Sequence, residues 1–271
     1  MNFIEIIVPV LILLILAWLN LEYSLLMPPR KGLAVLMYHK ISEKNPDKLT
    51  LTADKLDLQL MYLKEKGYRS LSFSELKNHS DKGEKLPPKT IIITFDDAYR
   101  NFGELALPLL KKYGFKATLF VPVAFMGKTN IWDQGRDPIL TAQEIKQISL
   151  QGNIDIGLHS FLHRSYADLA LEDMKEDLQN CFQNLDYWAI PYVRVLAYPY
   201  GGFPKKDKLL KSQMVNLFQQ LNMLYAVRIG NRINPFPIRN PYELKRIDIT
   251  GTDSFFIFRT KLKKGRAKFF A

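Results

Sequence analysis

Two adjacent carboxylates and two imidazoles form a set that can bind a metal ion and activate water. Asp96 and Asp97 end a run of apolar, β-branched residues, and His159 and His163 follow in the second half of the chain. Three of these groups can hold a divalent ion and the fourth can act as a base, because hydrolytic zinc sites commonly use three protein ligands and leave one position open. Neighbouring residues of a strand point in opposite directions, so one carboxylate can face the metal while the other faces the water. The alternative is that the two carboxylates only terminate a strand and that the two histidines are ordinary loop residues.

The sequence around these residues alternates between strands and helices. Strands are expected at residues 34–38, 90–95, 117–121, 154–157, 193–198 and 225–229, and helices at residues 53–66, 105–113, from 142 onward, 171–185 and 208–222. Such alternation predicts a mostly parallel sheet, either open or closed into a barrel. Asp96, Asp97, His159 and Tyr200 each come just after an expected strand. Because the carboxyl ends of parallel strands meet at one edge, these four residues are expected to lie together.

The motifs that carry these residues resemble those of the polysaccharide deacetylases, which form carbohydrate esterase family four and share the NodB-type domain. The first two motifs of the family resemble Thr94-Phe95-Asp96-Asp97 and His159-Ser160-x-x-His163 of this chain. The third motif of the family resembles Tyr198-Pro199-Tyr200-Gly201. Stretches at residues 36–41, 62–68 and 116–121 resemble the subgroup that deacetylates biofilm poly-N-acetylglucosamine. The resemblance extends over about residues 33 to 262. It implies a distorted (β/α)7 barrel and the metal-dependent removal of N-acetyl groups from an amino-sugar polysaccharide or glycan.

The resemblance also assigns a role to each member of the set. It implies that Asp97, His159 and His163 bind the metal and that Asp96 is the general base. A divalent cation polarises an amide carbonyl and lowers the pKa of water, whose proton the base then accepts. The two histidines are expected to share a face on a helical turn, with Ser160 as a donor that orients a ligand. Zinc is the expected metal, although oxygen and nitrogen ligands together also suit cobalt, nickel and iron.

Three further residues are candidates for substrate binding. The resemblance implies that the region of Tyr200, which includes Pro199, donates a backbone N–H to the oxyanion. Trp132 lies in a Trp-Asp stretch similar to one in relatives, and we expect it to line the sugar cleft. The alternative for Trp132 is packing in the core.

The amine that leaves in such a reaction needs a general acid. The chain contains four histidines, of which two are candidate ligands, and His79 is expected in an exposed polar turn. His39 therefore remains, at the end of the first expected strand, and an imidazole suits proton donation near neutral pH. The biofilm subgroup is circularly permuted and carries its acid histidine early, in a Tyr-His motif like Tyr38-His39. The alternative is that His39 only caps the end of a strand.

One position departs from the pattern of the family. Ordinary relatives carry an arginine three residues before the position of Tyr200, where it restrains the base, and this chain has Ala197 there. Arg246 is a candidate for the missing partner of Asp96, since the permuted order can bring it close. The alternative is that Arg246 forms a structural ion pair with Asp248.

Length and composition predict one catalytic domain with an apolar N-terminal segment. At 271 residues and 47% hydrophobic, the chain can bury a full core. Residues 3–19 are almost entirely apolar and lack both a basic start and a good cleavage site, which predicts an uncleaved transmembrane anchor at residues 1–27 and a catalytic domain at residues 28–271. The first basic residues, Arg30 and Lys31, follow this segment and favour a cytoplasmic domain. The family resemblance favours the other orientation, so we expect the domain outside the cytoplasm.

The net charge of +11 has two interpretations. In the first, solvated basic faces account for most of the charge. The second, which is more specific, is that basic residues near a membrane are attracted to anionic lipid. No nucleic-acid partner is expected, because zinc-finger spacing, a helix-turn-helix signal and stacked aromatic motifs are missing from the sequence.

Two other functions remain open at this stage. One is a catalytically inactive carbohydrate-binding or scaffold protein that keeps the barrel. The other is an O-acetyl esterase of a cell-surface polysaccharide, which would use the same groups. The full set of two carboxylates and two histidines argues against an inactive protein, because a binding module has no need of a base beside a metal.

Overall fold

The computed structural model describes residues 3–23, 28–133 and 135–267. The strands are β1 (Ala34–Tyr38), β2 (Lys40–Ser42), β3 (Thr50–Thr52), β4 (Arg69–Ser70), β5 (Thr90–Phe95), β6 (Ala117–Val121), β7 (Ile154–Leu158), β8 (Val195–Ala197), β9 (Tyr225–Ile229) and β10 (Leu244–Asp248). The helices are α1 (Phe3–Tyr23), α2 (Ala53–Glu65), α3 (Phe73–Asp81), α4 (Leu107–Tyr113), α5 (Ala142–Ser149), α6 (Leu171–Tyr187), α7 (Lys208–Gln220) and α8 (Phe255–Lys264). A π-helical turn, Phe102–Ala106, precedes α4.

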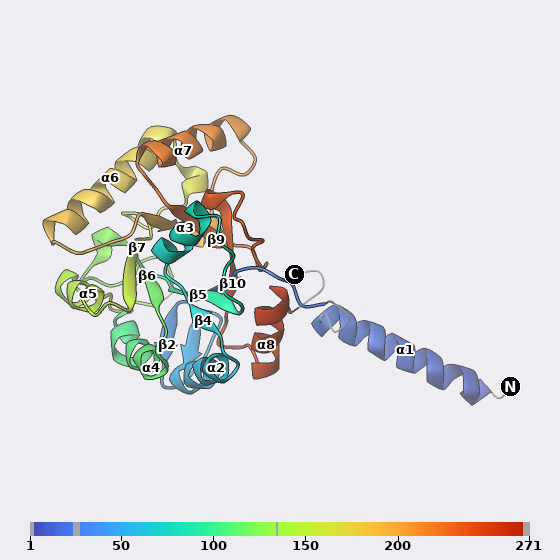
Figure 1. The fold of residues 1–271 in the computed structure, drawn as a ribbon. Helices are drawn as coiled ribbons and strands as arrows, with labels where there is room; N and C mark the ends of the chain where they lie inside the picture. Colours follow the sequence, from blue (N-terminus) through green and yellow to red (C-terminus); the bar gives the residue numbers. More distant parts are fainter. Residues whose placement is uncertain (1–2, 24–27, 134, 268–271) are drawn as a thin grey trace.

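Seven parallel strands close into a barrel around which the helices are arranged (Figure 1). The ring runs β1-β10-β9-β8-β7-β6-β5, and β5 pairs back with β1 along its length, from Ala34 opposite Ile91 to Tyr38 opposite Phe95. Every residue of β1 and β5 is buried, as expected for parallel strands that are covered on both faces. The expected (β/α)7 barrel is therefore confirmed.

The distortion of the barrel lies at β5. One edge of β5 is occupied by β1, so β4 and β6 must share the other edge at different heights. β4 pairs with Thr90 and Ile91 at the start of β5, whereas β6 pairs with Thr94 and Phe95 at its end. The short β4 therefore lies beside the start of β5, at the amino end of the barrel.

Most expected elements agree with the structure, one expectation was wrong, and two elements were not expected. The helix expected from residue 142 onward is α5, and a capping box starts it: the side chain of Thr141 accepts from the backbone of Glu144, and the side chain of Glu144 accepts from the backbone of Thr141. His79 lies in helix α3 and not in a polar turn, since a capping box at Ser72 starts a helix there. Strand β10 and helix α8 follow the last strand that we expected. Cys181 is buried in α6, and burial raises the pKa of its thiol, as suits an inert side chain.

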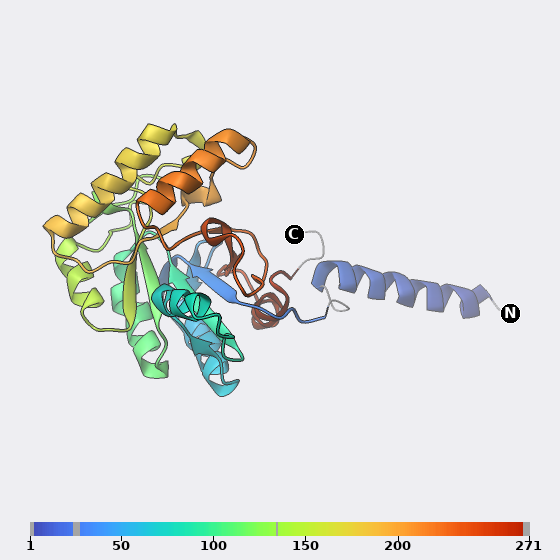
Figure 2. The same ribbon diagram turned by 45° about the horizontal axis from the view of Figure 1, so that its top comes forward.

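Helix α1 extends away from the barrel in two views (Figure 1 and Figure 2). Apart from Asn20, its described side chains are apolar, and most are about half exposed, for example Leu13 at 64% and Trp18 at 58%. Over the described part of the chain, however, no helix combines the length and apolarity needed to cross a membrane. The expected transmembrane helix is therefore not supported, and residues 1–2 and 24–27 of the expected anchor lie outside the described residues.

Candidate active site

The carboxyl ends of the barrel strands surround a cavity of about 190 Å³ that contains most of the expected site residues. β1 is followed by His39, β5 by Asp96 and Asp97, and β7 by His159 and His163. The other expected residues that line the cavity are Trp132, Tyr200 and Arg246. Pro199 is the exception, because it begins a short buried turn and does not line the cavity.

Asp97, His159 and His163 form a candidate metal centre. Their ligand atoms all lie within 4.8 Å of one another, and all three residues are buried. The carboxylate oxygen Oδ1 of Asp97 lies 3.3 Å from Nε2 of His159 and 3.1 Å from Nε2 of His163. The three groups therefore converge on one point, as the ligands of a single cation do.

The hydrogen bonds around this centre test whether a cation fits it. Nδ1 of His159 lies 2.7 Å from the carbonyl oxygen of Ala197. A carbonyl only accepts, so Nδ1 carries a proton, and when the ring is neutral the lone pair of Nε2 faces Asp97. Oδ1 of Asp97 is buried and has no hydrogen-bond donor. Electron-rich atoms that face one another in a buried site are stabilised by a cation, so the residues fit a metal ion.

The electrostatics of the two histidines differ. Burial lowers the pKa of His163, which keeps its imidazole neutral and able to bind a metal. Burial also acts to lower the pKa of His159, but the carboxylates of Asp96 and Asp97 outweigh it and raise that pKa. The pKa of Asp97 is held well below its usual value, because contacts with both imidazoles outweigh its burial. A cation at this point would replace the protons that these pairs otherwise share.

Asp96 forms a buried ion pair with Arg246 of β10, and its Oδ2 lies 3.9 Å from Nε2 of His159. Nη1 of Arg246 donates to Oδ1 at 2.5 Å and Nη2 donates to Oδ2 at 2.7 Å, so both carboxylate oxygens are bound. Arg246 is 1% exposed and Asp96 is 2% exposed. Burial acts to raise the pKa of Asp96, but Arg246 and His159 outweigh it and lower that pKa. Asp96 is therefore an ionised carboxylate with a fixed orientation.

His39 is a further neighbour of Asp96. Its Nε2 is 3.8 Å from Oδ2 of Asp96, and its side chain is 14% exposed. Asp248, at the end of β10, also lines the cavity, and its half-buried carboxylate is close enough to His39 to interact with it electrostatically. Burial raises the pKa of Asp248. No ion pair between Arg246 and Asp248 is found among the described residues, so the alternative interpretation of Arg246 is not supported.

Aromatic side chains form the wall beside the candidate metal centre. The indole of Trp132 stacks on the imidazole of His163 with ring centroids 4.1 Å apart and an angle of 17° between the rings. Trp132 also packs edge-on against Phe125, so it lines the cavity and contacts the core at the same time. The hydroxyl of Tyr200 lies 3.2 Å from Nδ1 of His163, while the side chain of Tyr200 stays 61% exposed. These contacts hold the ring of His163 in place.

The loops that carry the site adopt strained backbone conformations. Positive φ angles occur at Asp97 (72°), Ser160 (63°), His163 (55°) and Tyr200 (57°). Such conformations are costly for residues other than glycine and tend to cluster at functional sites. Residues 159–163 therefore form a loop with left-handed positions, and the expected helical turn was wrong.

The residue that anchors this loop was not among those we predicted from the sequence. Asp177 of α6 is buried and accepts hydrogen bonds from the hydroxyl of Ser160 (2.7 Å), the backbone N–H of Phe161 (2.9 Å) and the hydroxyl of Tyr166 (2.7 Å). Ser160 therefore holds the loop and does not orient a metal ligand, contrary to our expectation. A signal was present in the sequence, because Asp177 interrupts the apolar stripe of α6 between Met174 and Cys181.

A second anchor holds the segment that carries Trp132. Nζ of Lys40, the residue after His39, lies 2.8 Å from Asp133 and 2.6 Å from Asp137. The hydroxyl of Tyr99 also donates to Asp133 at 3.1 Å. The segment between β6 and α5 is thereby tied to the end of β1.

Comparisons with known proteins agree with this fold and site. The family model for polysaccharide deacetylases matches residues 83–216. The YxkH protein of Bacillus subtilis is 28% identical over 69% of this chain and 61% of its own length. The poly-beta-1,6-N-acetyl-D-glucosamine N-deacetylase of Staphylococcus epidermidis is 24% identical over 87% of this chain and 85% of its own length. The match to the Escherichia coli enzyme of the same name covers only 21% of that protein.

Solved structures show the same barrel. The Streptococcus pyogenes deacetylase PplD in complex with acetate has a TM-score of 0.70 and 24% identity, over 87% of this chain and 99% of that one. IcaB from Ammonifex degensii has a TM-score of 0.68 and 21% identity, over 82% of this chain and 93% of that one. The fold and the site together define a parallel barrel with a candidate metal centre at the carboxyl ends of its strands. The match over residues 83–216 and the relatives make this chain similar to the polysaccharide deacetylase family.

Proposed function

We propose that this chain is a metal-dependent hydrolase that removes N-acetyl groups from an amino-sugar polysaccharide. One observation carries the proposal. The candidate metal centre lies beside an ionised carboxylate, Asp96, which has Arg246 on one side and His39 on another. A base, an acid and a metal centre within one cavity are the groups that hydrolysis of an amide requires. A carbohydrate-binding module would need none of them.

The geometry suggests a role for each group. A divalent cation held by Asp97, His159 and His163 would polarise the acetyl carbonyl and lower the pKa of water. Asp96 accepts the proton of the attacking water, which forms the new C–O bond. His39 in its protonated form then donates a proton to the amine nitrogen as the C–N bond breaks. The products are acetate and a free amino sugar.

Arg246 acts in this scheme as a positioning residue for the base. Its guanidinium binds both oxygens of Asp96, which fixes the plane of the carboxylate and stabilises its charge in a buried position. Ordinary members of the family would supply this arginine from the position of Ala197, whereas here it comes from β10. The backbone N–H of Tyr200 is the proposed donor to the oxyanion, and Trp132 is the proposed platform for the sugar ring.

The proposed substrate is poly-β-1,6-N-acetylglucosamine or a similar glycan. The support is the printed name of the Staphylococcus epidermidis relative, which the chain matches over most of both lengths. Zinc is the proposed metal, because one carboxylate and two imidazoles are a common ligand set for catalytic zinc. Cobalt, nickel and iron remain the other candidates for this donor set.

Release of acetate tests the proposal. The purified protein is dialysed against chelator, reloaded with one metal at a time, and incubated with N-acetylated and O-acetylated glycans. Release from poly-N-acetylglucosamine with zinc is the expected result. Release from O-acetylated glycans alone would identify an esterase, and no release with any metal on any glycan would favour an inactive binding protein.

We further propose that the barrel acts outside the cytoplasm, attached to a membrane through residues 1–27. The support is the apolar, half-exposed surface of α1 and the family resemblance. Fractionation of cells and protease digestion of intact spheroplasts test this. A soluble protein, or a barrel that is protected from protease in spheroplasts, would contradict the proposal.

A further inference from the structure

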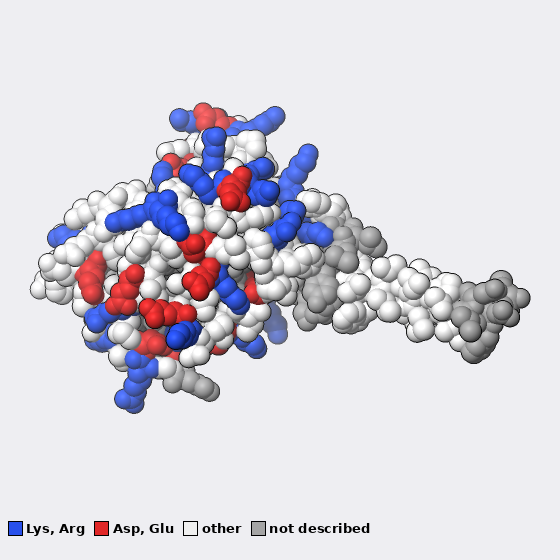
Figure 3. Space-filling model, turned by 90° about the horizontal axis from the view of Figure 1, so that it is seen from below, with Lys and Arg blue, Asp and Glu red and all other residues white. Residues whose placement is uncertain are grey.

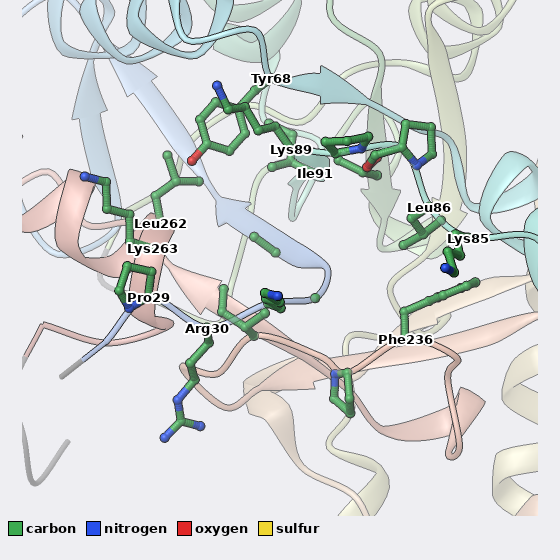
Figure 4. A pocket seen from close by; sticks show the side chains of 18 residues that line it. Pro29, Arg30, Tyr68, Lys85, Leu86, Lys89, Ile91, Phe236, Leu262 and Lys263 are labelled. Atoms are coloured by element: carbon green, nitrogen blue, oxygen red, sulfur yellow. The ribbon is translucent and has the colours of Figure 1, made fainter.

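A second and larger cavity, of about 780 Å³, lies at the opposite end of the barrel from the candidate active site. Ala34 and Ile91, at the starts of β1 and β5, form part of its floor. The apolar side chains of Tyr68, Phe236 and Leu262 surround it from different sides (Figure 4). This end of the barrel contains none of the residues that the proposed reaction uses.

The wall of this cavity is held in place by backbone hydrogen bonds. The N–H of Arg30 donates to the carbonyl of Lys263 at the end of α8. The backbones of Leu33 and Asn234 exchange two hydrogen bonds, at 2.8 and 2.9 Å. Residues 30–33, which precede β1, are therefore fixed against α8 and the loop after β9, and the cavity is a formed feature of the fold.

The charged groups around the cavity are all positive. Among the described residues that line it, none is aspartate or glutamate. Figure 4 shows Lys85 at one end of the cavity and Arg30 and Lys263 at the other. The basic lining residues are Arg30, Lys31, Lys85, Lys89 and Lys263. Cations around an apolar floor match a ligand that carries both a negative charge and a hydrocarbon part.

The surroundings indicate where such a ligand would come from. The cavity lies at the junction between α1 and the barrel, because Pro29 to Gly32 form part of its lining. Lys and Arg side chains gather on the body near this junction, while the described surface of α1 carries no charged group (Figure 3). An apolar helix beside a basic cavity is the arrangement that a surface of anionic lipid would match.

We propose that this cavity binds an anionic phospholipid, with the phosphate among the basic residues and part of an acyl chain against Tyr68, Phe236 and Leu262. A free phosphate would explain the cations but not the apolar floor. A neutral lipid would explain the floor but not the cations. Bound lipid would hold the amino end of the barrel against the membrane surface and turn the candidate active site away from it.

Short-chain lipids below their critical micelle concentration test whether the cavity binds single lipid molecules, because no vesicle surface is present. The full-length protein is titrated with dihexanoyl phosphatidylglycerol, dihexanoyl phosphatidylcholine and glycerol 3-phosphate, and binding is followed by calorimetry. We expect the phosphatidylglycerol to bind at least tenfold more tightly than either of the other two. Equal affinity for the two lipids would overturn the proposal. An affinity for glycerol 3-phosphate equal to that for the phosphatidylglycerol would also overturn it, in favour of a small-anion site.

Two matched triple variants locate the binding. Arg30→Gln/Lys85→Gln/Lys263→Gln removes three charges from the cavity and should weaken binding of phosphatidylglycerol by about 100-fold, at about fivefold for each basic residue. The control, Lys44→Gln/Lys111→Gln/Lys206→Gln, removes three charges elsewhere and should bind as the unmodified protein does. An equal loss of affinity in both variants would refute this cavity as the site. Phe236→Ser should weaken phosphatidylglycerol alone, and an unchanged affinity would refute the acyl contact.

Discussion

Replacement of Arg246 by methionine should destabilise the protein and change the protonation of the proposed base. The substitution keeps much of the volume of the side chain but leaves Asp96, which is 2% exposed, without its closest cation. Removal of one partner from a buried ion pair costs about 3–5 kcal/mol, because the remaining charge is neither hydrated nor paired. For a domain of this size, such a loss corresponds to a fall in Tm of roughly 6–20 °C.

The loss of stability in Arg246→Met should be larger at neutral pH than in acid. Arg246 and His159 lower the pKa of Asp96 in the folded protein against the effect of burial. The ion pair therefore stabilises the fold fully above the pKa of the unfolded carboxyl, about 3.9, and this stabilisation is lost as the pH falls through the lower folded value. The difference in stability between the unmodified protein and Arg246→Met should be full at pH 7 and should narrow in acid. The acid limb of the pH–rate profile should move to higher pH in the variant, because its Asp96 takes up a proton more readily.

Urea unfolding at several pH values measures these differences. Arg69→Met is the matched control, because Arg69 is exposed, and the same substitution there should change the free energy of unfolding by less than about 0.5 kcal/mol. The double variant Asp96→Asn/Arg246→Met removes both charges and should be more stable than the sum of the two single effects predicts. A free energy of unfolding for Arg246→Met within about 1 kcal/mol of the unmodified protein, with an unmoved acid limb, would refute the reasoning.

Three further predictions concern the groups that surround the substrate. His163→Ala should remove both metal and activity, since it deletes one of three ligands; full metal occupancy by elemental analysis would contradict the assignment. Asp96→Asn should retain the metal and lower turnover by about 10² to 10⁴, and near-normal turnover would exclude the role of base. His39→Ala should leave metal affinity intact, suppress deacetylation and alter the alkaline limb of the pH–rate profile; an unaltered limb would exclude the role of acid.

The local order of residues was enough to predict which side chains share the cavity. Asp96 and Asp97 follow one apolar strand and His159 follows another, and the carboxyl ends of parallel strands lie at one edge of a barrel. Elimination among the four histidines and the Tyr-His resemblance predicted His39 as a further member of the site, and the structure brings it to within 3.8 Å of Asp96. Periodicity and capping signals likewise predicted most strands and helices, because these depend on residues that are close in the sequence.

The sequence by itself therefore predicted a parallel sheet and the residues at its carboxyl edge, and the family resemblance implied the barrel. The tertiary structure decided which distant groups surround these residues. Arg246 lies 150 residues from Asp96 on β10, a strand that we did not expect, and only closure of the ring between β1 and β10 brings the two together. Asp177 reaches the loop of His159 only because α6 packs over it. The basic cavity at the amino end is assembled from five separate segments of the chain. Contacts of this kind join residues that are far apart in the sequence. They depend on how the elements pack in space, and the spacing of neighbouring residues does not predict that packing.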